Sequence, residues 1–148
     1  MIKKFILLFF IQLFIANSSI SMEKETTFNK KLFDKAQSEG KVVIVSSWIK
    51  YCSSCASQMK VLNKAKNDGK LFDIKFDNIE YFSFDVTNKD IANLLNVKFQ
   101  TTLLIFKNNK EIYRSLGETS KSKIYKAIEK SLSNKLSITI NSGASIGS

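Results

Sequence analysis

Histidine and proline are both absent from this chain of 148 residues, and cysteine occurs only twice. Without histidine, the chain lacks the commonest general base and the commonest transition-metal ligand of proteins. Two cysteines are too few for a scaffold held together by several disulfides. A hydrophobic content of 44% excludes wholesale disorder, and five glycines without proline exclude collagen-like order. The length suits one globular domain.

Arginine is also scarce, since Arg114 is the one arginine among 23 basic residues and lysine supplies nearly all of the net charge of +10. Sites that recognise nucleic acid favour arginine because its guanidinium makes paired and stacked contacts. The excess of lysine therefore indicates a solvated basic surface, and we expect no nucleic-acid partner.

The N-terminal segment has the pattern of a secretory signal peptide, which we assign to residues 1–21. Lys3 and Lys4 precede an apolar run over residues 5–16, and small polar residues follow it. The run is about twelve residues long, whereas a membrane-spanning helix needs about twenty. We expect cleavage after Ser18 or Ser21 and a periplasmic or secreted protein, membrane-anchored only if the segment is kept.

The rest of the chain alternates between two hydrophobic patterns. Apolar residues three and four apart predict helices, and runs of β-branched and aromatic residues predict strands. The expected helices cover residues 26–39, 52–68 and 88–96, with a last helix after Ser120 that continues through Leu132. The expected strands cover residues 42–48, 79–86, 102–106 and 111–116. The serine-, asparagine- and glycine-rich tail, 135–148, is expected to be disordered.

This order of elements predicts an α/β fold. Helices between strands indicate right-handed crossovers and parallel pairing. Asn108-Asn109 is a tight-turn signal, so the last two strands are expected to be antiparallel, and Gly117 ends the hairpin. We therefore expect one domain, residues 22–134, with a central mixed four-stranded sheet flanked by helices on both faces.

One motif carries chemistry: Cys52-Ser53-Ser54-Cys55, between a predicted buried strand and a predicted helix. Unpaired N–H groups and the positive dipole end at a helix start stabilise a thiolate, so the pKa of the Cys52 thiol should be lowered, with Lys50 adding to the effect. Cys52 can then attack a substrate disulfide. Cys55, expected to be less exposed, can attack the mixed disulfide and release the substrate.

Two other interpretations of the cysteine pair remain open. Structural zinc usually takes four Cys or His ligands, so this chain could hold a metal only in a metal-bridged dimer. The pair could also be an inert disulfide in a non-catalytic binding module, because disulfides persist in exported proteins. The favoured hypothesis is a catalytic dithiol, which needs no cofactor and no metal.

The segment from Val43 to Cys55 resembles the active-site strand and turn of the thioredoxin family, and the segment from Thr102 to Lys110 resembles that family's later strand and hairpin. The resemblance covers about residues 27–134. Within the family, residues 84–97 are most similar to exported members such as the reducing domain of the bacterial membrane disulfide reductase. The resemblance implies a thioredoxin-like fold.

The resemblance also implies a function and a set of site residues. Cys52 would be the nucleophile and Cys55 the resolving thiol, with Trp48 and Tyr51 on the substrate-facing surface. The chain would be an exported thiol–disulfide oxidoreductase, a monomer that reduces or exchanges disulfides of other exported proteins. In an oxidising compartment, a reductase would need an electron donor, which we expect to be a membrane protein.

Three residues depart from the family's pattern. Thr101, which we expect to contact substrate, takes the place of the family's cis-proline in the substrate-docking loop. A cis bond before a non-proline residue costs about 2.5–4 kcal/mol. We therefore expect a trans bond, or a strained cis bond held by packing. Ser46 and Ser83 stand where many members carry a buried aspartate and its lysine partner. Deprotonation of Cys55 would then depend on water or a group such as Asp85, and the resolving step should be slower.

Overall fold

The computed structural model describes residues 24–67 and 78–133. The predicted signal segment, the predicted tail and the predicted end of the second helix at Asp68 lie outside these residues. Within the described part of the chain, no helix combines the length and the apolar character that crossing a membrane requires.

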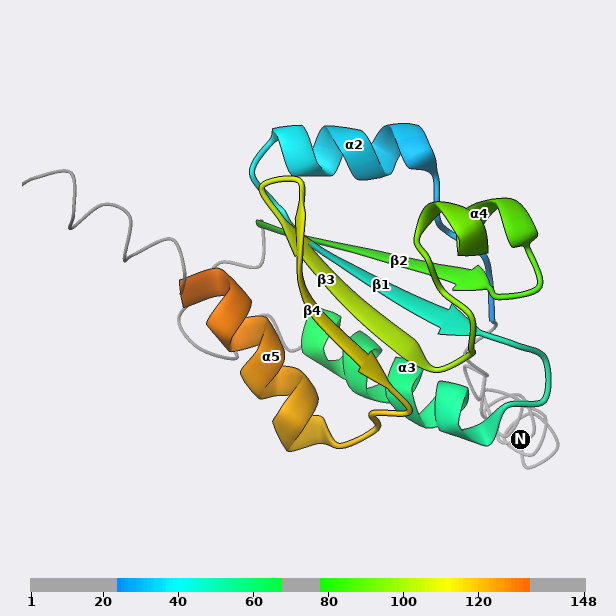
Figure 1. Ribbon diagram of the computed structural model, residues 1–148. Coiled ribbons are helices and arrows are strands. Elements are labelled where there is room, and N and C mark those ends of the chain that lie inside the picture. Colours follow the sequence, from blue (N-terminus) through cyan, green and yellow to red (C-terminus); the bar gives the residue numbers. More distant parts are fainter. Residues whose placement is uncertain (1–23, 68–77, 134–148) are drawn as a thin grey trace, which may run out of the picture.

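Four strands form one mixed sheet in the order β2-β1-β3-β4, with α2 and α4 on one face and α3 and α5 on the other (Figure 1). This arrangement confirms the predicted fold class. The strands are β1 (Val42–Trp48), β2 (Ile79–Asp85), β3 (Thr102–Lys107) and β4 (Lys110–Leu116). The helices are α2 (Lys30–Ser38), α3 (Ser53–Asn67), α4 (Lys89–Leu94) and α5 (Lys121–Ser133).

The direction of β3 differs from the prediction, because β3 is antiparallel to β1 whereas β2 is parallel to it. Helix length explains the difference. The 15 residues of α3 span about 22 Å, which matches the roughly 23 Å of a seven-residue strand and returns the chain to the start of the sheet. The six residues of α4 span only about 9 Å. The chain therefore enters β3 at the end of the sheet where β2 finishes, and β3 runs in the opposite direction.

α2 begins at Lys30, four residues after the predicted start of this helix. Asn29 is extended and its side-chain oxygen accepts a hydrogen bond from Leu32 N, which makes it the N-cap. The preceding residues instead join the edge of β2: Thr27 N and Phe28 N donate to Ser83 O at 2.8 and 3.0 Å. Two consecutive threonines favour this extended conformation because β-branched side chains lose rotamer freedom in a helix.

Two hydrophobic cores hold the central strands. Every residue of β1 is buried, as expected for a strand with helices on both faces. The core beneath α2 and α4 includes Phe28, Phe33, Val43, Val45, Phe84 and Leu104. The core beneath α3 and α5 includes Ile44, Leu62, Leu103, Ile105, Ile124 and Ile128. The carboxyl end of β1, where the cysteine motif begins, is therefore fixed by packing on both sides.

Candidate active site

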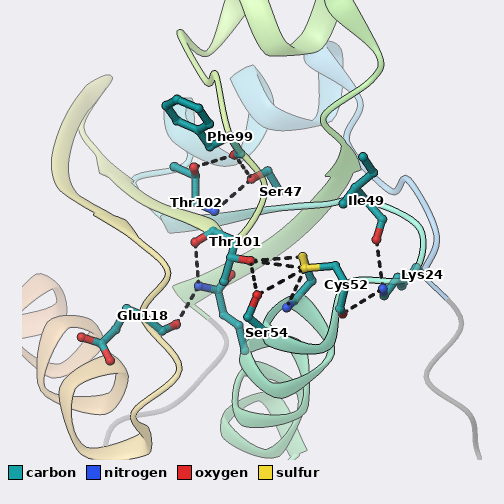
Figure 2. The surroundings of a disulfide bond; sticks show 11 residues. Lys24, Ser47, Ile49, Cys52, Ser54, Phe99, Thr101, Thr102 and Glu118 are labelled. Atoms are coloured by element: carbon teal, nitrogen blue, oxygen red, sulfur yellow. Dashed lines mark hydrogen bonds between the residues drawn. A yellow bond between two sulfur atoms is a disulfide. The ribbon is translucent and has the colours of Figure 1, made fainter.

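Cys52 and Cys55 lie where the chain passes from the end of β1 into α3, and they form a disulfide (Figure 2). Cys52 precedes the helix and is partly exposed, whereas Cys55 is only 1% exposed. The predicted difference in exposure is confirmed. An incoming sulfur can therefore reach Cys52, while Cys55 is accessible only from within the site.

The start of α3 favours a negative charge on Cys52. The backbone N–H of Cys55 donates to Cys52 Sγ at 3.1 Å, which is the contact expected of an unpaired amide in the first turn. The first turn contains no acidic residue to oppose the helix dipole. Lys50 lies over the ring of Tyr51, 5.1 Å from its centroid, and its expected effect on Cys52 stays a prediction.

Another lysine contacts the motif. Lys24 Nζ donates to the carbonyl oxygens of Ile49 and Cys52 at 3.0 and 3.1 Å (Figure 2). Both carbonyls belong to the loop between β1 and α3. The ammonium group thus holds the loop in position and brings a positive charge to Cys52.

The Thr101 side chain lies against the disulfide on the side away from Lys24 (Figure 2). Its hydroxyl oxygen lies 3.2 Å from Cys55 Sγ and 3.5 Å from Cys52 Sγ. It also lies 2.9 Å from the Ser54 hydroxyl, which is itself 3.3 Å from Cys52 Sγ. The peptide bond before Thr101 is trans, which confirms the first of the two expectations for this residue.

Of the three residues expected to contact substrate, Tyr51 is 92% exposed, Trp48 only 9% and Thr101 only 2%. Trp48 is the last residue of the buried central strand, so it supports the site from below, and its contact with substrate stays a prediction. Phe99 and Leu116 are also exposed, at 58% and 62%. Phe99 lies two residues before Thr101, and Leu116 pairs in register with the residue after it. Exposed apolar side chains therefore lie on the motif itself, on the loop that carries Thr101 and at the end of β4.

Ser46 and Ser83 are partners in the register of β1 and β2. A cavity of about 200 Å³ lies at this point, lined by both serines and by Met59 and Tyr81 among others. The Asp85 carboxylate accepts hydrogen bonds from the backbone and side chain of Thr87. The Thr101 hydroxyl oxygen lies next to Cys55 Sγ, at 3.2 Å. That Asp85 or water assists the deprotonation of Cys55 stays a prediction.

Three residues of the site were missed by sequence reasoning. Gln58 is fully buried, and its side-chain nitrogen donates to the carbonyls of Thr101 and Glu118 at 3.3 and 2.8 Å. A polar residue three positions after Cys55, on the buried side of an expected helix, could have indicated this role. Ser54 lies within the motif but was assigned no role. Lys24 has no sequence signal, because its partners are backbone carbonyls.

No group of three or more cysteine, aspartate or glutamate side chains is placed to hold a metal ion in residues 24–67 and 78–133. The arrangement around Cys52 instead provides N–H and O–H donors for a sulfur anion. Its chemistry is thiol–disulfide exchange.

A family model described as Thioredoxin matches residues 19–130. Thioredoxin-1 of Saccharomyces cerevisiae is 28% identical over 86 residues, which make up 57% of this chain and 77% of that protein. The solved structure of Trxlp from Edwardsiella tarda has a TM-score of 0.58 and 26% identity, and the match covers 66% of this chain and 90% of that one. A thioredoxin from Malassezia sympodialis has a TM-score of 0.55 and 24% identity, covering 69% and 84%. This last likeness supports the fold.

Proposed function

This chain belongs to the thioredoxin family and is a thiol–disulfide oxidoreductase, and we propose that it reduces or exchanges the disulfides of other exported proteins. The observation that carries the proposal is the cysteine pair itself. Cys52 is partly exposed beside N–H and O–H donors, and Cys55 is buried within bonding distance of it. A purely structural disulfide would not need one accessible sulfur surrounded by hydrogen-bond donors.

The proposed reaction has two exchange steps. The Cys52 thiolate attacks a substrate disulfide, forms a mixed disulfide and releases one substrate thiolate. Cys55 loses its proton and attacks Cys52 Sγ, which releases the second substrate thiolate and forms the Cys52–Cys55 disulfide. Two electrons pass from the cysteine pair to the substrate. A dithiol donor must then return them, and we propose a membrane protein for that role because no soluble reductant pool is expected outside the cytoplasm.

The surface around Cys52 supports a protein substrate. Tyr51, Phe99 and Leu116 are exposed apolar side chains from three separate segments. Scattered apolar side chains are ordinary on a protein surface, but these lie on segments that adjoin the reactive sulfur. An unfolded or extended polypeptide could bury them while its disulfide approaches Cys52.

We propose that the protein acts as a monomer.

Substitution of each cysteine tests the activity. Cys52→Ser should abolish the protein's acceleration of the reduction of an insulin-like disulfide substrate by dithiothreitol, which leaves the uncatalysed rate. Cys55→Ser should accumulate a mixed disulfide with the substrate, visible by non-reducing electrophoresis and mass spectrometry. If both variants reduce the substrate as fast as the unaltered protein, the proposed function is wrong.

Export is a separate proposal that rests on the N-terminal pattern of residues 1–21. Cell fractionation of the source organism, followed by N-terminal sequencing, should find a mature chain that begins at Ser19 or Met22. A chain that keeps Met1 in the membrane fraction would indicate an uncleaved anchor. Recovery of the whole chain in the cytoplasm would contradict export.

A further inference from the structure

Two hydroxyl groups link the two sulfurs of the site. From Cys55 Sγ, the distance to Thr101 Oγ1 is 3.2 Å, from there to Ser54 Oγ 2.9 Å, and from there to Cys52 Sγ 3.3 Å (Figure 2). Thr101 is only 2% exposed, and a buried hydroxyl needs hydrogen-bond partners. Its partners here are the Ser54 hydroxyl and the sulfurs.

The Thr101 hydroxyl is held in place by its own backbone. Thr101 N donates to Ser47 O at 2.9 Å, and Thr101 O accepts from Gly117 N at 2.9 Å and from the buried Gln58 side chain. A proline could not make the first of these bonds, since it has no N–H. Thr101 also has a φ of 58°, which is an outlier for a β-branched residue and costs about 1–3 kcal/mol. The surroundings thus fix a strained residue with its oxygen against the disulfide.

Each of the three contacts in this chain can take either donor direction. Each hydroxyl has one proton and two acceptor sites. A disulfide sulfur is a weak acceptor, whereas a thiolate is a strong, charged one. We propose that in the reduced protein Cys55 S–H donates to Thr101, Thr101 O–H donates to Ser54, and Ser54 O–H donates to the Cys52 thiolate. The two hydroxyls would then stabilise the reduced pair with Cys52 ionised and Cys55 protonated.

This proposal rests on the proposed function and gives it a direction. When a dithiol donor such as dithiothreitol reduces the disulfide, two electrons and one proton enter the pair, and Cys52 thiolate and Cys55 thiol form. The donor becomes a disulfide and releases its second proton to solvent. Anything that stabilises the reduced form makes the disulfide a stronger oxidant. The hydroxyls therefore move this pair toward disulfide exchange and away from strong reduction.

The test compares Thr101→Val with Thr102→Val. Valine keeps the shape and β-branching of threonine and removes only the hydroxyl. Thr102 is an equally buried neighbour whose hydroxyl donates to Phe99 O rather than to sulfur, so its variant is the matched control. Two quantities are measured on the full chain: the pKa of Cys52 from thiolate absorbance, and the equilibrium constant for reduction by glutathione at pH 8. Lys24, the charged group that contacts Cys52, is the same in all variants.

In Thr101→Val, the ionisation constant of Cys52 should fall about tenfold, the equivalent of about 1.4 kcal/mol. The equilibrium constant for reduction should also fall about tenfold, which corresponds to a potential about 30 mV more negative. Thr101→Ser, which keeps the hydroxyl, should restore both quantities to within about twofold. Thr102→Val should leave both unchanged.

Two results would overturn the proposal: no change in Thr101→Val, or an equal change in Thr102→Val. If Thr101→Val does not fold, Ser54→Ala is compared with Ser53→Ala, and only the first should lower the equilibrium constant, at least threefold. Failure of the proposed function is distinguishable. It would leave the unaltered protein without turnover and with an ordinary thiol pKa, whereas failure of this inference alone would leave its activity intact.

Discussion

Lys24 holds the site from a position 28 residues before the first cysteine in the chain. Its ammonium donates to two loop carbonyls, and hydrogen bonds from charged groups are worth about 1.5–3 kcal/mol when buried and less when part-exposed. Lys24→Met should lower the free energy of unfolding by about 1 kcal/mol and raise the pKa of Cys52, because a nearby positive charge is lost.

Urea unfolding and the thiolate titration check this prediction, with Lys31→Met as the control. Lys31 is an exposed lysine on α2, so its variant changes the net charge equally without touching the loop. Equal effects of the two variants would show that the Lys24 contacts contribute nothing.

At the scale of single residues, the sequence predicted the reactive groups and missed most of what surrounds them. Cys52 and Cys55 could be found because spacing and position at a helix start are local properties. The contact of Thr101 with both sulfurs joins residues 46 and 49 positions apart. Nothing local indicates such a contact, and the resemblance pointed to Thr101 only as a substrate-contacting residue in the place of a proline.

At the scale of elements, α3 connects the cysteine pair to the two loops opposite it through Gln58. The buried Gln58 side-chain nitrogen donates to the carbonyls of Thr101 and Glu118. The oxygen of the same amide has no hydrogen-bond partner in the described part of the chain. Gln58→Met keeps the length of the side chain and removes these bonds. It should lower the free energy of unfolding by about 1 kcal/mol, the low end for buried hydrogen bonds, because it also removes the unpaired oxygen.

Urea unfolding measures the effect of Gln58→Met, and Ser57→Ala, an exposed substitution on the same helix, serves as its control. The Gln58 variant should also change the pKa of Cys52, because Thr101 loses one of the hydrogen bonds that hold it in place. Unchanged stability and an unchanged titration would contradict the role given to this side chain.

The elements themselves were predictable where the pattern was local. β1 has the predicted bounds, and Asn108 and Asn109 both have the positive φ, 51° and 59°, that a tight hairpin turn requires. The direction of β3 was not predictable from alternation alone, because it depends on whether α4 is long enough to cross the sheet. The start of α2 was missed because Thr27 and Phe28 satisfy their N–H groups on β2 instead of in a helix.

At the scale of the whole molecule, one buried tyrosine should make stability fall in alkali. Burial, with a smaller effect of Tyr125, raises the pKa of Tyr81 above its ordinary value, and its hydroxyl has no hydrogen-bond partner in the part of the chain that the structure describes. The unfolded chain therefore ionises first. The favourable effect of keeping Tyr81 neutral is complete below about pH 10 and is lost as the pH rises above it.

Tyr81→Phe should remove this loss and flatten the dependence of stability on pH above about pH 10. At neutral pH it should leave stability unchanged or raise it by up to about 1 kcal/mol, because a buried hydroxyl without a partner is removed. Urea unfolding between pH 7 and 11 checks both effects, and Tyr51→Phe, at the most exposed tyrosine, is the control. If the free energy of unfolding changes with pH in the same way for Tyr81→Phe and the unaltered protein, the prediction is wrong.

The site is assembled by the fold as a whole. It combines Lys24, the first turn of α3 and the loop before β3, and each contributes a group within hydrogen-bonding distance of the cysteine motif. Such an arrangement has a purpose only if the disulfide opens and closes during the protein's work.

The reduction potential of the Cys52–Cys55 pair, measured by equilibration with glutathione, tests this most directly. Structural disulfides typically lie below about −300 mV, and working oxidoreductases lie between about −270 and −120 mV. We predict a value within the second range. A value below about −300 mV, with no reaction of the reduced protein toward a disulfide substrate, would contradict it.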